Sequence, residues 1–182
     1  MEALPSSTFL EPERIIRYFD LEHGDHVADF GAGHGYFTIP MAKAVGGDGK
    51  VYALDIQKSV LDIVRNRAKL EHLLNIELVW ANLEEPKGSK LQNNFLEFVL
   101  IANILFQAEN KLLFFQEAHR VLRERKGLAV IEWDQFQDSL GPPVNLRVKK
   151  EDTKRWAAEA GFVFDREFEA GSHHYGLLFK KT

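Results

Sequence analysis

The stretch of sequence that decides the fold is Val27-Ala28-Asp29-Phe30-Gly31-Ala32-Gly33-His34-Gly35-Tyr36-Phe37-Thr38. Its first four residues predict a short buried strand, and its three alternate glycines predict a tight turn that leads into a helix. Glycine allows the backbone to adopt positive φ and allows a ligand to approach the bare main chain. The N-terminus of a helix directs unpaired N–H groups and the positive end of its dipole at the same place. The stretch therefore predicts a cofactor-binding turn.

Two classes of cofactor fit such a turn. Dinucleotide-binding domains require G-x-G-x-x-G, in which the third glycine allows close packing of helix on strand. Here Tyr36 occupies the sixth position of that pattern, and the third glycine comes one residue earlier, at Gly35. The observed D-x-G-x-G-x-G pattern resembles motif I of the class I S-adenosylmethionine (SAM)-dependent methyltransferases, where the turn cradles the methionine and ribose of the cofactor. The alternative is an ordinary glycine-rich turn that binds nothing.

The rest of the chain alternates predicted helices and strands. Helices are predicted at 11–19, 37–45, 59–68, 112–123 and 153–160, and strands at 27–30, 51–55, 76–80, 95–102 and 128–133. We expect Ser59, with Asp62 three residues on, to cap its helix, and Gly127 to break the chain before the last of these strands. Two further strands, 162–168 and 175–179, are joined through Gly171 and Ser172 as a hairpin.

This order of elements strengthens the resemblance, because the class I methyltransferase fold ends in an antiparallel strand whereas dinucleotide-binding domains continue parallel. The predicted fold class is α/β: one Rossmann-like, doubly wound, mainly parallel seven-stranded sheet with an antiparallel C-terminal strand and helices on both faces. We expect a single domain over residues 1–182, with an N-terminal cap segment and helix at 1–20. The chain resembles most the small-molecule branch that includes the quinone-biosynthesis methyltransferases, from Pro12 through Lys180.

Composition excludes several kinds of chemistry. The 182 residues include no cysteine, which excludes disulfides, thiolate nucleophiles, cysteine-bound zinc and the cysteine-dependent methylation of arsenite found in some relatives. A net charge of -4 argues against a large nucleic-acid surface. The sequence has no long apolar segment, so we expect no membrane insertion, and residues 1–9 lack the basic and apolar regions expected of a secretory signal. The cytoplasm is therefore the default expectation, and the oligomeric state is left open.

Family resemblance implies a set of cofactor-binding residues at the ends of the strands, where ligands bind in open α/β sheets. They are Asp29, Gly31, Ala32, Gly33, Gly35, Asp55, Ile56, Asn82, Leu83 and Asn103. Asp55 is implied to accept hydrogen bonds from both ribose hydroxyls, which suits a carboxylate because it accepts and does not donate. Asp29 is implied to face the methionine ammonium. The alternatives are a solvated turn acid for Asp55 and an acid at a helix N-terminus for Asp29.

Other polar residues give weaker indications. Asn82 stands where many relatives carry an acid that contacts the adenine amino group, and Asn103 follows the predicted central strand. The residues from Asn103 onward do not form the N/D-P-P-Y/F motif of enzymes that methylate amide or exocyclic nitrogens, which argues against DNA adenine or glutamine substrates. The alternative for both asparagines is an ordinary loop residue. No set of acids or histidines has the spacing of a metal site, so we expect no metal requirement. His173 and His174 face opposite sides of a strand, which favours a structural or solvent role.

The sequence thus predicts a SAM-dependent methyltransferase that acts on a small molecule and releases S-adenosylhomocysteine (SAH). The alternatives are an RNA (tRNA) methyltransferase and a non-catalytic SAM-binding scaffold that partners another chain. The pattern assigns no catalytic base. Four aromatic residues are candidates for the pocket wall, with core packing as the alternative role: Tyr36, Phe37, Phe106 and Trp133. Segments 5–10 and 135–148 are expected to cover the site, although terminal fraying explains the first of them equally well.

Overall fold

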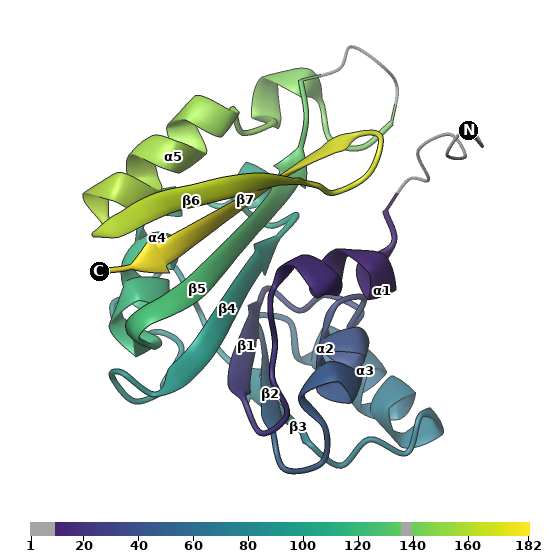
Figure 1. Cartoon of the computed structure of the whole chain (residues 1–182). Helices are drawn as coiled ribbons and strands as arrows, with labels where there is room; N and C mark the ends of the chain where they lie inside the picture. The colour runs from purple at the N-terminus through teal and green to yellow at the C-terminus, as the bar shows by residue number, and fades with distance from the viewer. Residues whose placement is uncertain (1–9, 136–139) are drawn as a thin grey trace, which may run out of the picture.

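The computed structural model describes residues 10–135 and 140–182, which form a seven-stranded sheet in the order β3-β2-β1-β4-β5-β7-β6 (Figure 1). The strands are β1 (His26–Phe30), β2 (Lys50–Asp55), β3 (Ile76–Trp80), β4 (Leu96–Ala102), β5 (Leu122–Trp133), β6 (Phe162–Glu169) and β7 (His174–Lys181). Strands β1 to β5 pair in parallel, and β7 is antiparallel to both of its neighbours, β5 and β6. The predicted fold class is confirmed, including the antiparallel C-terminal strand.

Helices cover both faces of the sheet (Figure 1). They are α1 (Pro12–Ile15), η1 (Ile16–Tyr18), α2 (Thr38–Val45), α3 (Lys58–Leu70), η2 (Leu105–Gln107), α4 (Lys111–Val121), η3 (Val144–Leu146) and α5 (Lys150–Glu159). Alternate residues of β4 show the two layers: Val99 and Ile101 pack into the core beneath α4 and α5, whereas Leu100 packs into the core beneath α1 and α2. None of the described helices has the length and apolar character needed to cross a membrane.

The predicted cap of α3 is wrong. Helix α3 begins at Lys58 with Gln57 as its N-cap residue, and Ser59 lies inside the first turn. The backbone N–H of Gln57 donates to Asp55 Oδ1 at 2.9 Å. The carboxylate at the end of β2 therefore satisfies a donor at the start of α3, which leaves no capping role for Ser59.

The predicted break at Gly127 is also wrong, because β5 begins at Leu122 and contains Gly127. Leu122 pairs with Leu96 and Gly127 pairs with Phe98, so that the intervening residues of β5 bulge out of the ladder. A Cβ added at Gly127 would lie 3.0 Å from the Phe98 ring. Glycine here permits the close approach of a neighbouring side chain within the sheet and does not end the strand.

Candidate functional site

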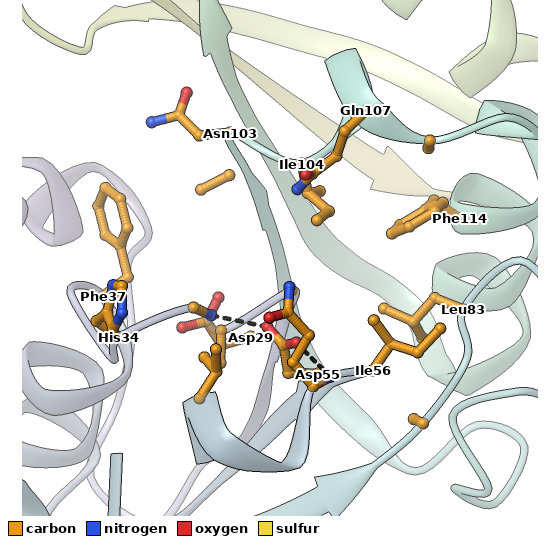
Figure 2. Close-up of a pocket in the computed structure, with 18 of the residues that line it drawn as sticks. Asp29, His34, Phe37, Asp55, Ile56, Leu83, Asn103, Ile104, Gln107 and Phe114 are labelled. Atoms are coloured by element: carbon orange, nitrogen blue, oxygen red, sulfur yellow. Dashed lines mark hydrogen bonds between the residues drawn. The ribbon is translucent and has the colours of Figure 1, made fainter. Parts of the chain in front are cut away.

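A cavity of about 720 Å³ opens at the carboxyl ends of β1, β2, β3 and β4 (Figure 2). This volume lies within the usual range for small-molecule sites. All the residues predicted to bind cofactor line the cavity except Gly35: Asp29, Gly31, Ala32, Gly33, Asp55, Ile56, Asn82, Leu83 and Asn103. Four consecutive strands therefore place the predicted residues around one space, as expected for the carboxyl edge of a parallel sheet.

The three glycines of the turn have different structural roles. A Cβ added at Gly31 would lie 2.9 Å from Ile104 Cγ1, so this position allows the loop after β4 to sit against the turn. A Cβ at Gly33 would meet only a backbone oxygen at 4.0 Å, which leaves its main chain open to a ligand. A Cβ at Gly35 would instead meet Val64 of α3 at 3.3 Å. Gly35 thus serves helix packing, which is why it does not line the cavity.

Asp55 joins the glycine turn to the start of α3. Its Oδ2 accepts the Gly33 N–H at 3.1 Å and its Oδ1 accepts the Gln57 N–H at 2.9 Å (Figure 2). A carboxylate has about four acceptor positions, so each oxygen keeps capacity for one more donor. The carboxylate is buried at the base of the cavity, where a ligand bearing two adjacent hydroxyls would find two oriented acceptors.

Asp29 is buried beside the glycine turn, and its Oδ2 accepts a 2.6 Å hydrogen bond from the Thr38 hydroxyl. Burial raises the pKa of Asp29 to about 6, the Thr38 hydrogen bond opposes that rise, and the negative charge of Asp55 adds to it. Thr38 was missed by sequence reasoning. Its position at the start of α2 indicates a polar helix terminus, but the partner nine residues earlier becomes evident only in the folded chain.

The remaining walls divide into two sides (Figure 2). On one side lie Ile56, Leu83 and Phe114, which give an apolar slot. On the other lie Phe37 and Asn103, with the two aspartates between the two sides. The slot suits a flat aromatic ring held by apolar contact.

Two of the four aromatic candidates, Tyr36 and Phe37, line the cavity, whereas Phe106 and Trp133 do not. The Trp133 ring packs on the ring of His174 instead, with centroids 4.3 Å apart. The two histidines do not share a strand as predicted: His173 lies in the turn before β7, whereas His174 is the first residue of β7 and is buried. Phe114, from α4, was missed by sequence reasoning because its apolar stripe indicates only a helix packed on the sheet.

The two asparagines differ in what their side chains contact. Asn82 donates from Nδ2 to Glu85 Oε1 at 2.9 Å and accepts the Glu84 N–H at 3.1 Å, so its amide is engaged in a local turn. The implied contact of Asn82 with adenine remains a prediction. Asn103 adopts φ 53°, and its buried Oδ1 has no hydrogen-bond partner within the described part of the chain. Asn103 lines the cavity as a residue, but this oxygen is itself buried and is not exposed to the cavity.

Two further expectations concern metal binding and the segments that were predicted to cover the site. Within residues 10–135 and 140–182, no group of three or more His, Asp or Glu side chains is arranged to hold a metal ion. Of the segments expected to cover the site, residues 5–9 and 136–139 lie outside the described residues. Leu10, at the end of the first segment, lines the cavity. Closure by either segment remains a prediction.

Known proteins match this chain along most of its length. A family model described as a methyltransferase domain matches residues 21–166. A demethylmenaquinone methyltransferase from Geobacillus stearothermophilus is 28% identical over 109 residues, which cover 60% of this chain and 45% of the relative. A demethylmenaquinone methyltransferase from Bacillus mycoides is 28% identical over 123 residues, which cover 68% and 51% of the two chains. The chain thus spans about half the length of these curated relatives.

Solved structures match a larger share of both chains than the curated relatives do. The crystal structure of a SAM-dependent methyltransferase from Aquifex aeolicus superposes with a TM-score of 0.87 and 26% identity. The match covers 96% of this chain and 91% of that one. Together with the family match, it confirms the resemblance inferred from the glycine turn, and with it SAM as the cofactor.

Proposed function

The chain belongs to the methyltransferase domain family, and from this premise we propose that it transfers a methyl group from SAM to a small molecule with a quinone-like ring. The observation that carries the proposal is Asp55, whose two oxygens are held by the Gly33 and Gln57 N–H groups and keep acceptor capacity toward the cavity. The quinone-like acceptor is suggested by the names of the relatives, which are demethylmenaquinone methyltransferases.

The residues present fit SAM. Asp55 would accept the ribose hydroxyls, the slot formed by Ile56, Leu83 and Phe114 would hold the adenine, and Asp29 would face the ammonium group of the methionine. The open main chain at Gly33 allows the cofactor to lie against the turn without meeting a side chain. Bound SAM supplies an electrophilic methyl group on a sulfonium.

The acceptor would occupy the side of the cavity lined by Leu10, Phe37, Ala102 and Asn103. Three of these residues are apolar, which suits a ring and excludes water from the reacting atoms. Because the methyl group of SAM is an electrophile, the electron-rich ring of a reduced, hydroxylated quinone is a better acceptor than the oxidised quinone.

Titration calorimetry with SAH tests the cofactor site. Asp55→Asn replaces one acceptor oxygen by a donor and should weaken SAH binding about 10- to 100-fold, since a hydrogen bond to a charged group contributes about 1.5–3 kcal/mol. The control is Asp62→Asn, an exposed acid on α3 that pairs with Arg65 and lies outside the cavity; its SAH affinity should match that of the wild type. Equal affinities of the Asp55→Asn variant and the wild type, or tight binding of NAD in place of SAH, would contradict the proposal.

Transfer itself is tested with methyl-labelled SAM and reduced 1,4-naphthoquinone as the acceptor. Label should appear in the organic product together with SAH, and an Asp55→Asn sample should form less of both. Label in added tRNA, with none in the quinol, would favour the RNA methyltransferase alternative. SAH binding without transfer to any tested acceptor would favour the non-catalytic scaffold.

A further inference from the structure

Glu132 is a buried carboxyl group just outside the cavity. It lies near the end of β5, its side chain is fully buried, and it does not line the cavity wall. One oxygen, Oε1, accepts the backbone N–H groups of Ile104 at 2.9 Å and Leu105 at 2.6 Å. The other oxygen, Oε2, has no hydrogen-bond partner among the residues that the structure describes. Burying a carboxyl group is costly unless it is well paired, so a packing role alone does not explain this residue.

The turn that Glu132 holds forms part of the cavity. Asn103 begins it in a left-handed conformation, with φ 53°, and its N–H donates to Ile131 O at 2.9 Å. Ile104 follows and faces the cavity between Asn103 and Phe114 (Figure 2). Ile104 also fits against the bare α-carbon of Gly31, where an added Cβ would lie 2.9 Å from Ile104 Cγ1. The turn after β4 and the glycine turn after β1 are thus in direct contact.

The two N–H groups of this turn depend on one side chain. Ile104 lies between β4 and the short helix η2, and Leu105 is the first residue of η2, so neither N–H takes part in the β ladder. A buried N–H without an acceptor is costly, and loss of Glu132 Oε1 would leave two of them adjacent to each other. The turn would then move to find other acceptors, and Asn103 and Ile104 would move with it. The positions of the methyl donor and of the acceptor ring would change relative to one another.

We propose that Glu132 is a positioning residue for methyl transfer: by holding the Ile104 and Leu105 N–H groups, it fixes the turn after β4 against the glycine turn. The inference rests on the proposed function, since it names the part of that cavity which Glu132 orients. Methyl transfer is sensitive to this kind of control because in-line geometry supplies much of the rate.

The charge of Glu132 provides a signature of this role. Burial raises the pKa of Glu132 to about 7, and the backbone N–H groups of Leu105, Ile104 and Trp133, together with the charge of Lys111, oppose the rise. Two titratable groups act on it from neighbouring elements: Lys111 of α4, whose ammonium donates to Ala108 O at 2.6 Å, and Tyr175 of β7, which is its partner across the sheet. As Glu132 ionises, its hydrogen bonds to the turn become charge-assisted and stronger. The amide resonances of Ile104 and Leu105 should therefore titrate with the carboxyl group.

Two variants of Glu132 and one control test the proposal. Glu132→Gln keeps a carbonyl oxygen for both N–H groups, whereas Glu132→Met keeps the volume and removes the acceptor. Glu117→Gln is the matched control: this buried acid on α4 accepts the Ser89 N–H at 2.9 Å and pairs with Arg120, away from the cavity. Each protein is assayed for unfolding temperature, SAH affinity, kcat and KM for reduced 1,4-naphthoquinone, and amide shifts of Ile104 and Leu105 against pH.

We expect Glu132→Met to lower kcat by about 10- to 100-fold, as for the loss of a buried hydrogen-bond partner, while SAH affinity stays close to the wild-type value. Glu132→Gln should retain most of kcat and lose the titration of the two amides. Glu117→Gln should lose stability but keep kcat and the titration. Wild-type kcat in Glu132→Met, or a loss of kcat in Glu117→Gln equal to that in Glu132→Met, would overturn the positioning role.

The amide titration separates this inference from the proposed function. It is measured without SAM, so it tests the link between Glu132 and the turn whether or not methyl transfer occurs. Amides of Ile104 and Leu105 that titrate in Glu132→Gln as they do in the wild type would overturn the inference alone. Wild-type protein that binds SAH but transfers no methyl group would overturn the proposed function, and the inference with it, even if the titration is present.

Discussion

At the scale of single residues, Asp29 and Thr38 show what a buried charge does to this site. The ionised form of Asp29 is disfavoured by burial, which raises its pKa from the ordinary 3.8 to about 6. The stability that the protonated form contributes is fully present below the ordinary pKa and is lost as the pH rises through 6. A ligand ammonium group placed against Asp29 would favour the ionised form and reverse this trend. Ligand binding and the pH dependence of stability are therefore linked at one carboxyl group.

This linkage predicts that SAH affinity rises with pH through the pKa of Asp29. Below about pH 6, affinity should fall by up to about tenfold for each pH unit, because binding then requires loss of a proton. Thr38→Val removes the 2.6 Å hydrogen bond to Asp29 and should move the midpoint of the profile to higher pH. Calorimetry at a series of pH values measures both effects, and Asp62→Asn should give the wild-type profile. A flat profile in the wild type would show that Asp29 does not contact the cationic group.

The same residues show how far sequence reasoning reached at this scale. The spacing D-x-G-x-G-x-G and the acid at the end of β2 predicted Asp29, Gly33 and Asp55 as site residues, and all three line one cavity. Thr38 and Glu132 could not be found in the same way, because each acts through a partner that is distant in the sequence. A buried hydrogen bond between distant residues leaves no periodic signal. The predicted contacts of Asp55 and Asn82 with cofactor still await a binding measurement.

At the scale of elements, the contact between the glycine turn and the turn after β4 decides the shape of the site. Substitution of Gly31 by alanine tests whether this contact contributes to stability and to ligand binding. It adopts φ 82°, and an alanine Cβ there would overlap Ile104. Gly24 adopts φ 91° and a Cβ there would meet nothing within 4 Å, so it has the same backbone strain without the overlap. Gly24→Ala is therefore a matched control for Gly31→Ala.

We expect both variants to lose about 1–2 kcal/mol of unfolding free energy, as for a left-handed residue with a side chain. Gly31→Ala should lose more than Gly24→Ala and should also bind SAH more weakly, because the added methyl group overlaps Ile104 and displaces the glycine turn that would hold the cofactor. Adding Ile104→Ala should restore part of the difference. Denaturant unfolding measures the free energy of unfolding, and calorimetry measures the SAH affinity, of the wild type, the two single variants and the Gly31→Ala/Ile104→Ala double variant. Equal losses for Gly31→Ala and Gly24→Ala would show that the contact carries no energy.

Element boundaries were predicted less well than element order, and α4 shows the reason. The apolar stripe of α4 continues through Leu122, so periodicity extends the helix to Arg123. In the structure α4 ends at Val121, and Leu122 already pairs with Leu96 in the sheet. Tertiary pairing with β4 overrides the local helical pattern there. Strand β3, Ile76–Trp80, has no such competition and begins and ends where the sequence predicts.

At the scale of the whole molecule, the cavity joins elements that belong to different cores. Asp29 lies on β1, and Phe37 lies in the turn that follows it. Leu83 follows β3, Ile104 lies in the turn after β4, and Phe114 lies on α4. Phe37 packs in the core beneath α1 and α2, whereas Phe114 packs in the core beneath α4 and α5. A ligand that fills the cavity therefore contacts both helical layers through the carboxyl edge of the sheet. Its binding should stabilise the molecule as a unit, by about 2.7 kcal/mol at a ligand concentration of 100 Kd.

Hydrogen exchange with and without SAH tests this coupling and the predicted cover together. The amides of Gly33 and Gln57, which donate to Asp55, and those of Ile104 and Leu105, which donate to Glu132, should gain protection because the ligand holds their acceptors in place. The sequence also predicts that segments 5–10 and 135–148 close over the ligand, since a site that excludes water favours sulfonium transfer. Those segments should then gain protection in the presence of SAH, and Asp55→Asn should abolish the gain at the same SAH concentration. Protection confined to the glycine turn and the turn after β4, with none in either segment, would show that the site works without a cover.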